Sequence, residues 1–234
     1  MSRSRFRPLG ELGRVAFLAS GLWFAIELVA QVGGAVVFEP VVGNYLVGSL
    51  VGVILGFPIA AWAVVRYGQR HGVTPGDWGY DRTSRALLSG FVVGGGLVIL
   101  NLTVVVTVTE AIFGQPEGIS GLLIEGLAGG LPVVVLFLLA HGLVASITEE
   151  LAFRGVVQTA LTRERGPLVG VLGAATLFSL KHILVDGSLE RVLPVVVLAL
   201  ILGVVRDRWG TGASTVTHAI VNVVQGSLVL IAFL

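Results

Sequence analysis

Residues 131–161, LPVVVLFLLAHGLVASITEELAFRGVVQTAL, form a long apolar run that contains two adjacent glutamates and an arginine. A helix that crosses the hydrocarbon core of a bilayer needs about 20 mostly apolar residues, and this run is longer than that. The whole chain of 234 residues has a mean hydropathy of +0.94 and only 12% charged residues, whereas typical soluble domains carry about 25%. The sequence therefore predicts an all-α, polytopic integral membrane protein and excludes an ordinary cytosolic globule.

Working outward from this run, we predict seven transmembrane helices in a single membrane domain, 1–234. The predicted spans are residues 15–38, 44–65, 86–110, 131–161, 167–184, 191–207 and 212–234. The segment 117–128 is too short and too charged to cross a bilayer, and we interpret it as an interfacial piece. The first span is longer than the apolar core of a cleaved signal peptide, about 7–15 residues, so we expect it to be retained.

Basic residues crowd alternate connections between these spans. They are Arg3, Arg5, Arg7 and Arg14 before the first span, Arg66, Arg70, Arg82 and Arg85 in the second connection, Arg163 and Arg165 in the fourth, and Arg206 and Arg208 in the sixth. The other connections are mostly acidic. Because cytoplasmic loops carry the excess of Lys and Arg, this pattern predicts a cytoplasmic amino terminus and an external carboxyl terminus.

The overall charge and the cysteine content exclude some function classes. The formal net charge is only +1, so the chain lacks the strong positive charge that attracts nucleic acids. There is no cysteine, which excludes disulfides, thiolate nucleophiles and cysteine-ligated metals. Composition therefore leaves the lipid bilayer as the expected partner and argues against a nucleic acid.

Ionisable residues inside apolar spans mark candidate functional sites, because each costs about 2.5–3.5 kcal/mol on insertion scales. The exceptions in this chain gather in three spans, apart from an isolated Glu27 in the first. They are Glu149, Glu150 and Arg154 in the fourth span, Lys181 and His182 at the end of the fifth, and His218, together with the polar but uncharged Asn222, in the last. We expect Lys181 either to reach the membrane interface or to pair with a carboxylate.

Helical spacing assigns different roles to the two glutamates. Glu150 and Arg154 are four residues apart on one helix face and are predicted to pair. This leaves Glu149, about 100° around the helix, as the carboxylate that is free for chemistry. The spacing of His218 and Asn222 likewise puts both side chains on one face.

One cavity could be lined by a carboxylate, two imidazoles and a carboxamide from three helices. Such a group could activate a water molecule to attack a carbonyl carbon. In this hypothesis Glu149 with His182 holds and deprotonates the water, while His218 and Asn222 donate to the developing oxyanion. Convergence of the histidine-bearing helices on Glu149, directly or through one water, favours hydrolysis. Dispersal over separate faces favours the rival hypothesis, a non-proteolytic membrane scaffold or carrier that uses the same polar cluster.

Three motifs in order resemble those of the CPBP intramembrane proteases, which include the type II CAAX prenyl endopeptidases and the Abi-like proteins. They are Glu-Glu-x-x-x-Arg at 149–154, Phe-x-x-x-His at 178–182 and His-x-x-x-Asn at 218–222. The resemblance covers residues 131–225 and implies a catalytic core there, whereas hydropathy alone supports the spans within 1–110. It implies that Glu149, His182, His218 and Asn222 are catalytic, with Glu150, Arg154 and Phe178 in support.

The resemblance implies an intramembrane hydrolase in the cell membrane, with its active site inside the bilayer. It would cleave a peptide bond of a membrane-associated substrate, and a CAAX-type prenylated protein is one candidate. The favoured mechanism needs no cofactor. A zinc-dependent metalloprotease is the alternative, because catalytic zinc takes three protein ligands and Glu149, His182 and His218 could supply them. The oligomeric state stays open, since the glycines at 48, 52 and 56 suit either dimerisation or internal helix packing.

Overall fold

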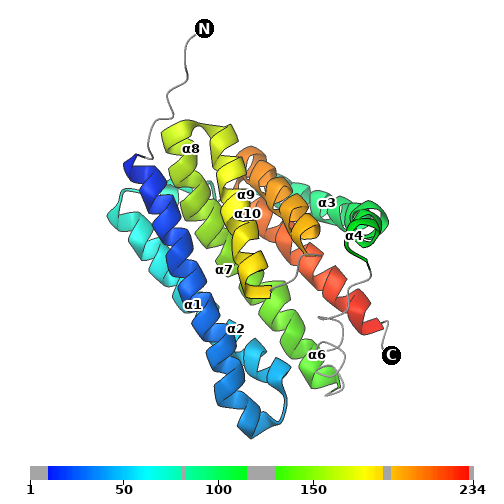
Figure 1. Cartoon of the computed structure of the whole chain (residues 1–234). Helices are drawn as coiled ribbons and strands as arrows, with labels where there is room; N and C mark the ends of the chain where they lie inside the picture. Colours follow the sequence, from blue (N-terminus) through cyan, green and yellow to red (C-terminus); the bar gives the residue numbers. More distant parts are fainter. Residues whose placement is uncertain (1–9, 81–82, 115–129, 187–190, 232–234) are drawn as a thin grey trace.

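The computed structural model of this chain describes residues 10–80, 83–114, 130–186 and 191–231, and those residues are helical apart from short turns (Figure 1). The amino-terminal half contains α1 (Glu11–Val42), α2 (Tyr45–Arg70), the 3₁₀ turn η1 (Pro75–Asp77), α3 (Ser84–Leu100), the π-helical η2 (Asn101–Val105) and α4 (Val106–Phe113). No strand occurs in these described ranges. The predicted interfacial piece, 117–128, lies outside them.

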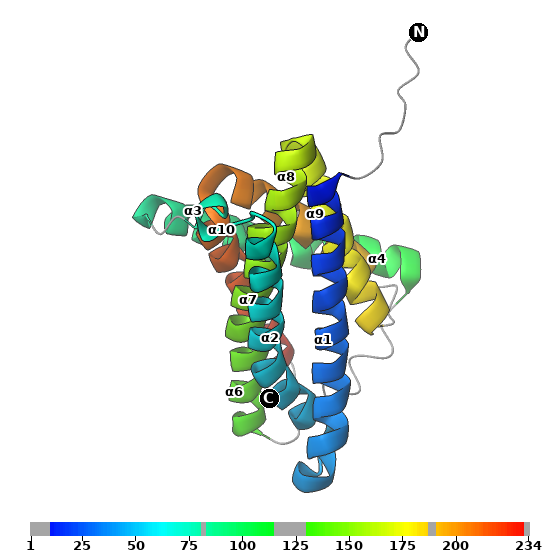
Figure 2. The same ribbon diagram turned by 90° about the vertical axis from the view of Figure 1, so that its left-hand side faces the viewer.

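A long composite helix runs through the middle of the bundle. It consists of α6 (Leu131–Phe137), η3 (Leu138–Ala145), α7 (Ser146–Glu150), η4 (Leu151–Gln158) and α8 (Thr159–Arg165). The hairpin of α1 and α2 packs on one side of it, and α9 (Pro167–Asp186) and α10 (Val192–Ile231) pack on the other, with α3 against α10 (Figures 1 and 2). Side chains of the central helix can therefore contact four neighbouring elements.

Five helices of the described ranges are long and apolar enough to cross a membrane. They are Glu11–Val42, Tyr45–Arg70, Ser84–Phe113, Leu131–Arg165 and Pro167–Val185, and they coincide with the first five predicted spans. These five support a multi-pass membrane protein. The count of seven spans and the orientation of the amino terminus stay predictions.

The sixth and seventh predicted spans fall in α10, which bends back on itself at Gly210. That glycine has non-helical angles, φ 84° and ψ 170°, a left-handed region that favours glycine. Leu198 and Val221 belong to one apolar cluster, although they would lie more than about 30 Å apart in a straight helix that rises 1.5 Å per residue. We therefore describe α10 as two arms, 192–209 and 211–231.

The connections predicted to be cytoplasmic meet at one end of the bundle. Glu164 at the end of α8 accepts hydrogen bonds from the backbone N–H of Gly13, at 2.6 Å, and of Gly10. Arg163 pairs with Asp77 of the second connection at 3.3 Å, and Arg206 donates to the Asp77 carbonyl at 3.3 Å. The alternation of basic connections along the sequence thus corresponds to a shared end in space.

The glycines of α2 serve packing within the chain. A Cβ at Gly52 would overlap the Ala30 carbonyl oxygen of α1, and Gly48 lies against Gly34 and Ala35 of the same helix. Small residues at such positions let two helix backbones approach closely. Of the two roles expected for this motif, the structure therefore uses internal packing.

Two π-helical stretches, η3 and η4, flank the short helix α7 that carries both glutamates. Such stretches widen the helical turn and are frequent at functional sites. Within this region the Ser146 hydroxyl donates to the carbonyl of His141, five residues earlier, at 3.2 Å. The predicted span 131–161 is therefore helical throughout, but its turns are wider on both sides of the acidic pair.

Candidate active site

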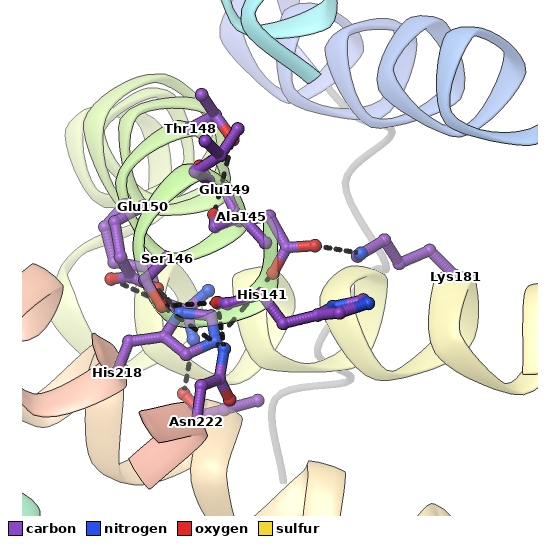
Figure 3. A network of polar contacts seen from close by, with 12 residues as sticks. His141, Ala145, Ser146, Thr148, Glu149, Glu150, Lys181, His218 and Asn222 are labelled. Atoms are coloured by element: carbon purple, nitrogen blue, oxygen red, sulfur yellow. Dashed lines mark hydrogen bonds and ion pairs between the residues drawn. The ribbon is translucent and has the colours of Figure 1, made fainter. Parts of the chain in front are cut away.

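Three elements bring the predicted site residues together around α7 (Figure 3). Glu149 and Glu150 end α7, Lys181 and His182 lie on α9, and His218 and Asn222 lie on the second arm of α10. In Figure 3, His218 and Asn222 approach α7 from one side and Lys181 from another. The centre of the site is buried, since Glu149 is 3% exposed, His218 2% and Lys181 3%, whereas His182 and Asn222 are half-buried.

Glu149 uses its two carboxylate oxygens differently. Oε1 accepts a hydrogen bond from Lys181 Nζ at 2.6 Å, while Oε2 lies 3.9 Å from His218 Nε2. The expectation of an unpaired Glu149 is therefore wrong. Of the two positions expected for Lys181, the structure has the second: its side chain turns into the bundle and pairs with a carboxylate.

Glu150 links the central helix to α10. Its Oε2 lies 3.5 Å from Arg154 Nε, so the predicted pair is present, and its Oε1 lies 3.2 Å from His218 Nδ1. Arg154 also donates to the carbonyl of Ala199 on the first arm of α10, at 3.1 Å. Glu150 and Arg154 are both fully buried. Paired buried charges are expected here, since an unpaired ion would carry a desolvation penalty of several kcal/mol.

His218 lies between the two carboxylates. An ionised Glu150 can only accept hydrogen bonds, so the 3.2 Å contact places the proton of this bond on His218 Nδ1. Nε2 then points toward Glu149 Oε2. At 3.9 Å these two atoms are too far apart for a direct hydrogen bond but close enough for one water to contact both.

Asn222 is held by η3 and by the first residue of α7. Its Nδ2 donates to the His141 carbonyl at 3.0 Å and to the Ser146 hydroxyl oxygen at 3.2 Å. Ser146 is fully buried, and sequence reasoning missed it because serine is common in membrane helices. Its position three residues before Glu149, on the same side of the helix, is the signal that would have found it.

His182 and the other predicted residues surround one aromatic ring. The Phe178 ring lies 4.8 Å from the His182 ring and 6.0 Å from the His218 ring, and the Arg154 guanidinium lies 4.7 Å from its centre. His182 is half-buried and close enough to Glu149 to interact with it electrostatically. Phe178, fully buried, thus packs against His182 of its own helix and against His218 of α10.

The first helix also reaches the site, through Glu27. Lys181 Nζ donates to Glu27 Oε1 at 3.0 Å, and the indole of Trp23 donates to Glu27 Oε2 at 2.8 Å. Gln31 donates to Glu27 Oε1 at 3.1 Å. Glu27 is 2% exposed. The isolated charge in the first apolar run was the sequence signal for this contact, but its partner was not predictable.

The three residues suggested as zinc ligands do not fit a metal centre. Within the described ranges, no group of three or more His, Cys, Asp or Glu side chains is arranged to hold a metal ion. The Lys181 ammonium contacts Glu149 Oε1, where a bound cation would be repelled by it. The metalloprotease alternative therefore receives no support from the donor set.

A scan against protein families finds one match in this part of the chain. Residues 131–224 match the family model described as type II CAAX prenyl endopeptidase Rce1-like. The matched segment contains the central helix, α9 and most of α10, and thus the carboxylates, histidines and carboxamide of the site. No curated protein and no solved structure matches this chain.

Proposed function

We propose that this chain is an intramembrane endopeptidase that uses a glutamate-activated water, and the match of residues 131–224 to the type II CAAX prenyl endopeptidase Rce1-like family supports this. The observation that carries this proposal is the pairing of Glu149 Oε2 with His218 Nε2 at 3.9 Å, inside a buried site. Two helices from distant parts of the sequence converge there within reach of one water. A scaffold or carrier would not require that convergence.

The proposed chemistry is addition of water to a peptide carbonyl. Glu149 Oε2 accepts a proton from the water while the water oxygen bonds to the carbonyl carbon, and the same proton then passes to the leaving amine as the C–N bond breaks. His218 Nε2 and His182 help to hold the water. A donor role for His218 toward the oxyanion requires a proton on Nε2 as well, since Nδ1–H already donates to Glu150.

Asn222 is the second proposed donor to the oxyanion. Its Nδ2 contacts the His141 carbonyl oxygen of η3 and the Ser146 hydroxyl oxygen of α7, so one of these contacts has to give way, or be shared, when the oxyanion forms. Removing one oxyanion donor from an enzyme typically costs about 10²–10³ in kcat. We propose residues 131–225 as the catalytic core, with Glu150, Arg154 and Phe178 in support.

The proposed substrate is a membrane-tethered peptide or protein, and a CAAX-type prenylated carboxyl terminus is the first candidate. Glu149 precedes Arg163, at the basic end of the bundle, by 14 residues, about 21 Å of helix at 1.5 Å per residue. The proposed site therefore lies within the bilayer of the cell membrane, and substrate and water both have to reach it there.

The test uses the purified full chain in proteoliposomes with two peptides, one farnesylated at a CAAX terminus and one membrane-anchored without a prenyl group. Products are identified by mass spectrometry, with chelator added and withheld. Glu149→Gln and His218→Ala should abolish cleavage. Glu164→Gln, the same substitution on the same composite helix but at the far end, should not. Full activity of Glu149→Gln would refute the mechanism, and loss of activity with chelator would reinstate the metal alternative.

A further inference from the structure

We infer that Lys181 is a positioning residue that orients Glu149 for the attack by water, and that Glu27 of α1 holds Lys181 in place. The inference rests on the proposed function and adds two residues that lie outside the three motifs. Glu27 also lies outside the matched segment, 131–224, so it would connect the amino-terminal helices to the chemistry.

The three charges form a continuous buried chain. Lys181 Nζ lies 2.6 Å from Glu149 Oε1 and 3.0 Å from Glu27 Oε1, and all three side chains are almost completely buried. Trp23 fixes the other oxygen of Glu27 at 2.8 Å. Each carboxylate therefore has one oxygen on the ammonium, and only Glu149 keeps its second oxygen directed at a histidine.

The site is shaped for an ammonium group. Lys181 is the only lysine in a chain whose other basic side chains are all arginine. Its Nζ lies 5.1, 5.9 and 6.0 Å from the ring centres of Phe178, Trp23 and Phe57, within the range of cation–π attraction. An ammonium is a compact charge with three donors, whereas a guanidinium is a wide planar fork. The two carboxylates and three rings around Nζ therefore suit an ammonium better than a guanidinium.

The consequence for catalysis is orientational. A glutamate side chain can rotate about its last torsion, which is broad and exchanges the two oxygens. The short bond from Lys181 to Oε1 stops that exchange and keeps Oε2 toward His218. Displacement of a reacting group by about 1 Å can cost about 10²-fold in rate, so loss of this bond should act on the chemical step rather than on substrate binding.

The kinetic test compares Lys181→Met, Glu27→Gln and the double variant. Methionine keeps the length of the side chain and suits the aromatic surroundings. We expect Lys181→Met to lower kcat about 100-fold with KM within about twofold, and Glu27→Gln to lower kcat about 10-fold. Because Glu27 acts through Lys181, the double variant should be no slower than Lys181→Met alone. The inference is overturned if the double variant loses the product of the two single-variant losses in kcat. It is also overturned if the kcat of Lys181→Met equals or exceeds that of the unmodified chain.

The matched control is Gln158→Met. Gln158 is fully buried in η4 and donates to the Gly203 carbonyl at 2.9 Å, away from Glu149. This variant should lose stability but keep kcat, which separates positioning from general damage to the bundle. If the unmodified chain cleaves a peptide and Lys181→Met has the same kcat, the inference is refuted and the proposed function stands. If the unmodified chain cleaves neither peptide, the proposed function fails and the inference fails with it.

A single lysine allows a second measurement that needs no turnover. Lysine labelled with ¹³C and ¹⁵N should give one side-chain NMR signal from the full chain carrying a lysine-free tag. We expect this signal to shift in Glu149→Gln and in Glu27→Gln but not in Gln158→Met. A signal that responds to neither carboxylate replacement overturns the inference.

Discussion

Glu150 and His218 are joined by a contact of 3.2 Å between Oε1 and Nδ1, and this contact ties α7 to the second arm of α10. The other oxygen of Glu150 faces Arg154, which in turn donates to Ala199 on the first arm. One carboxylate thus sets the tautomer of a proposed catalytic histidine and also neutralises a buried cation. These two duties can be separated by mutation.

Glu150→Gln should lower both kcat and stability. Loss of the carboxylate changes the partner of His218 Nδ1, and misplacement of a reacting group by about 1 Å can cost about 10²-fold in rate. It also leaves Arg154 buried without its counter-ion, at a cost of about 3–5 kcal/mol. The double variant Glu150→Gln/Arg154→Met should recover most of the stability and none of the kcat. Thermal unfolding in detergent and peptide cleavage measure the two effects, and joint recovery would contradict the assignment to His218.

Ser146→Ala should impair the proposed oxyanion donor without touching it directly. The Ser146 hydroxyl accepts one of the two hydrogen bonds from Asn222 Nδ2, at 3.2 Å. Without it, Asn222 is anchored only by the His141 carbonyl and its amide is free to turn away from the oxyanion, so we expect kcat to fall by up to about 10²-fold with KM little changed. Thr148→Val is the control on the same helix, since its hydroxyl bonds only to the carbonyls of its own preceding turn in the described contacts. Equal losses in both variants would show that the Asn222 contact is not special.

Gly52→Ala should separate α1 from α2. The added methyl group would overlap the Ala30 carbonyl oxygen, a backbone atom that cannot rotate away, and overpacking of this kind costs about 1–3 kcal/mol. Because Glu27 lies one helical turn from Ala30, cleavage should fall too. Gly33→Ala, on the same hairpin, meets nothing within 4 Å and should be neutral or slightly stabilising. Thermal unfolding of the two variants measures this difference in stability, and equal melting temperatures would contradict the packing role of Gly52.

Hydropathy was sufficient to locate the first five helices, because a membrane requires about 20 apolar residues per span and permits few exceptions. The apolar stretch 44–65, for example, begins at the N-cap of α2, Tyr45–Arg70, and ends inside that helix. The break between 207 and 212 likewise corresponds to the reversal of α10 at Gly210. The π-helical stretches had no signal of this kind, since they change the turn of a helix and not its composition.

The partners of the charged residues were less predictable. Spacing within one helix was enough to pair Glu150 with Arg154, because both lie on the same face. The contact of Lys181 with Glu27 and Glu149 depends on how α1, α7 and α9 are rotated about their axes. Rotation follows from packing of whole helix faces, so a single sequence showed only that each charge lay in an apolar span.

Asp77 should make the stability of the basic end of the bundle depend on pH. The Thr74 backbone N–H and hydroxyl each donate to its Oδ2 at 2.8 Å, and Arg163 lies at 3.3 Å. These contacts, the Thr74 hydrogen bonds first, hold the pKa of Asp77 below its ordinary value of 3.8. The contribution of these contacts to the free energy of unfolding is complete above the unfolded-state pKa, about 3.9, and is lost as pH falls through the lower folded-state pKa.

Asp77→Asn should therefore cost about 1 kcal/mol of stability at pH 7, as for the loss of a cap, and progressively less below about pH 4. Arg163→Gln should keep most of that pH dependence, since exposed ion pairs contribute only about 0–1 kcal/mol. Unfolding midpoints of the three proteins between about pH 3 and 7 test this, and a gap between the unmodified chain and Asp77→Asn that stays constant over that range would contradict it.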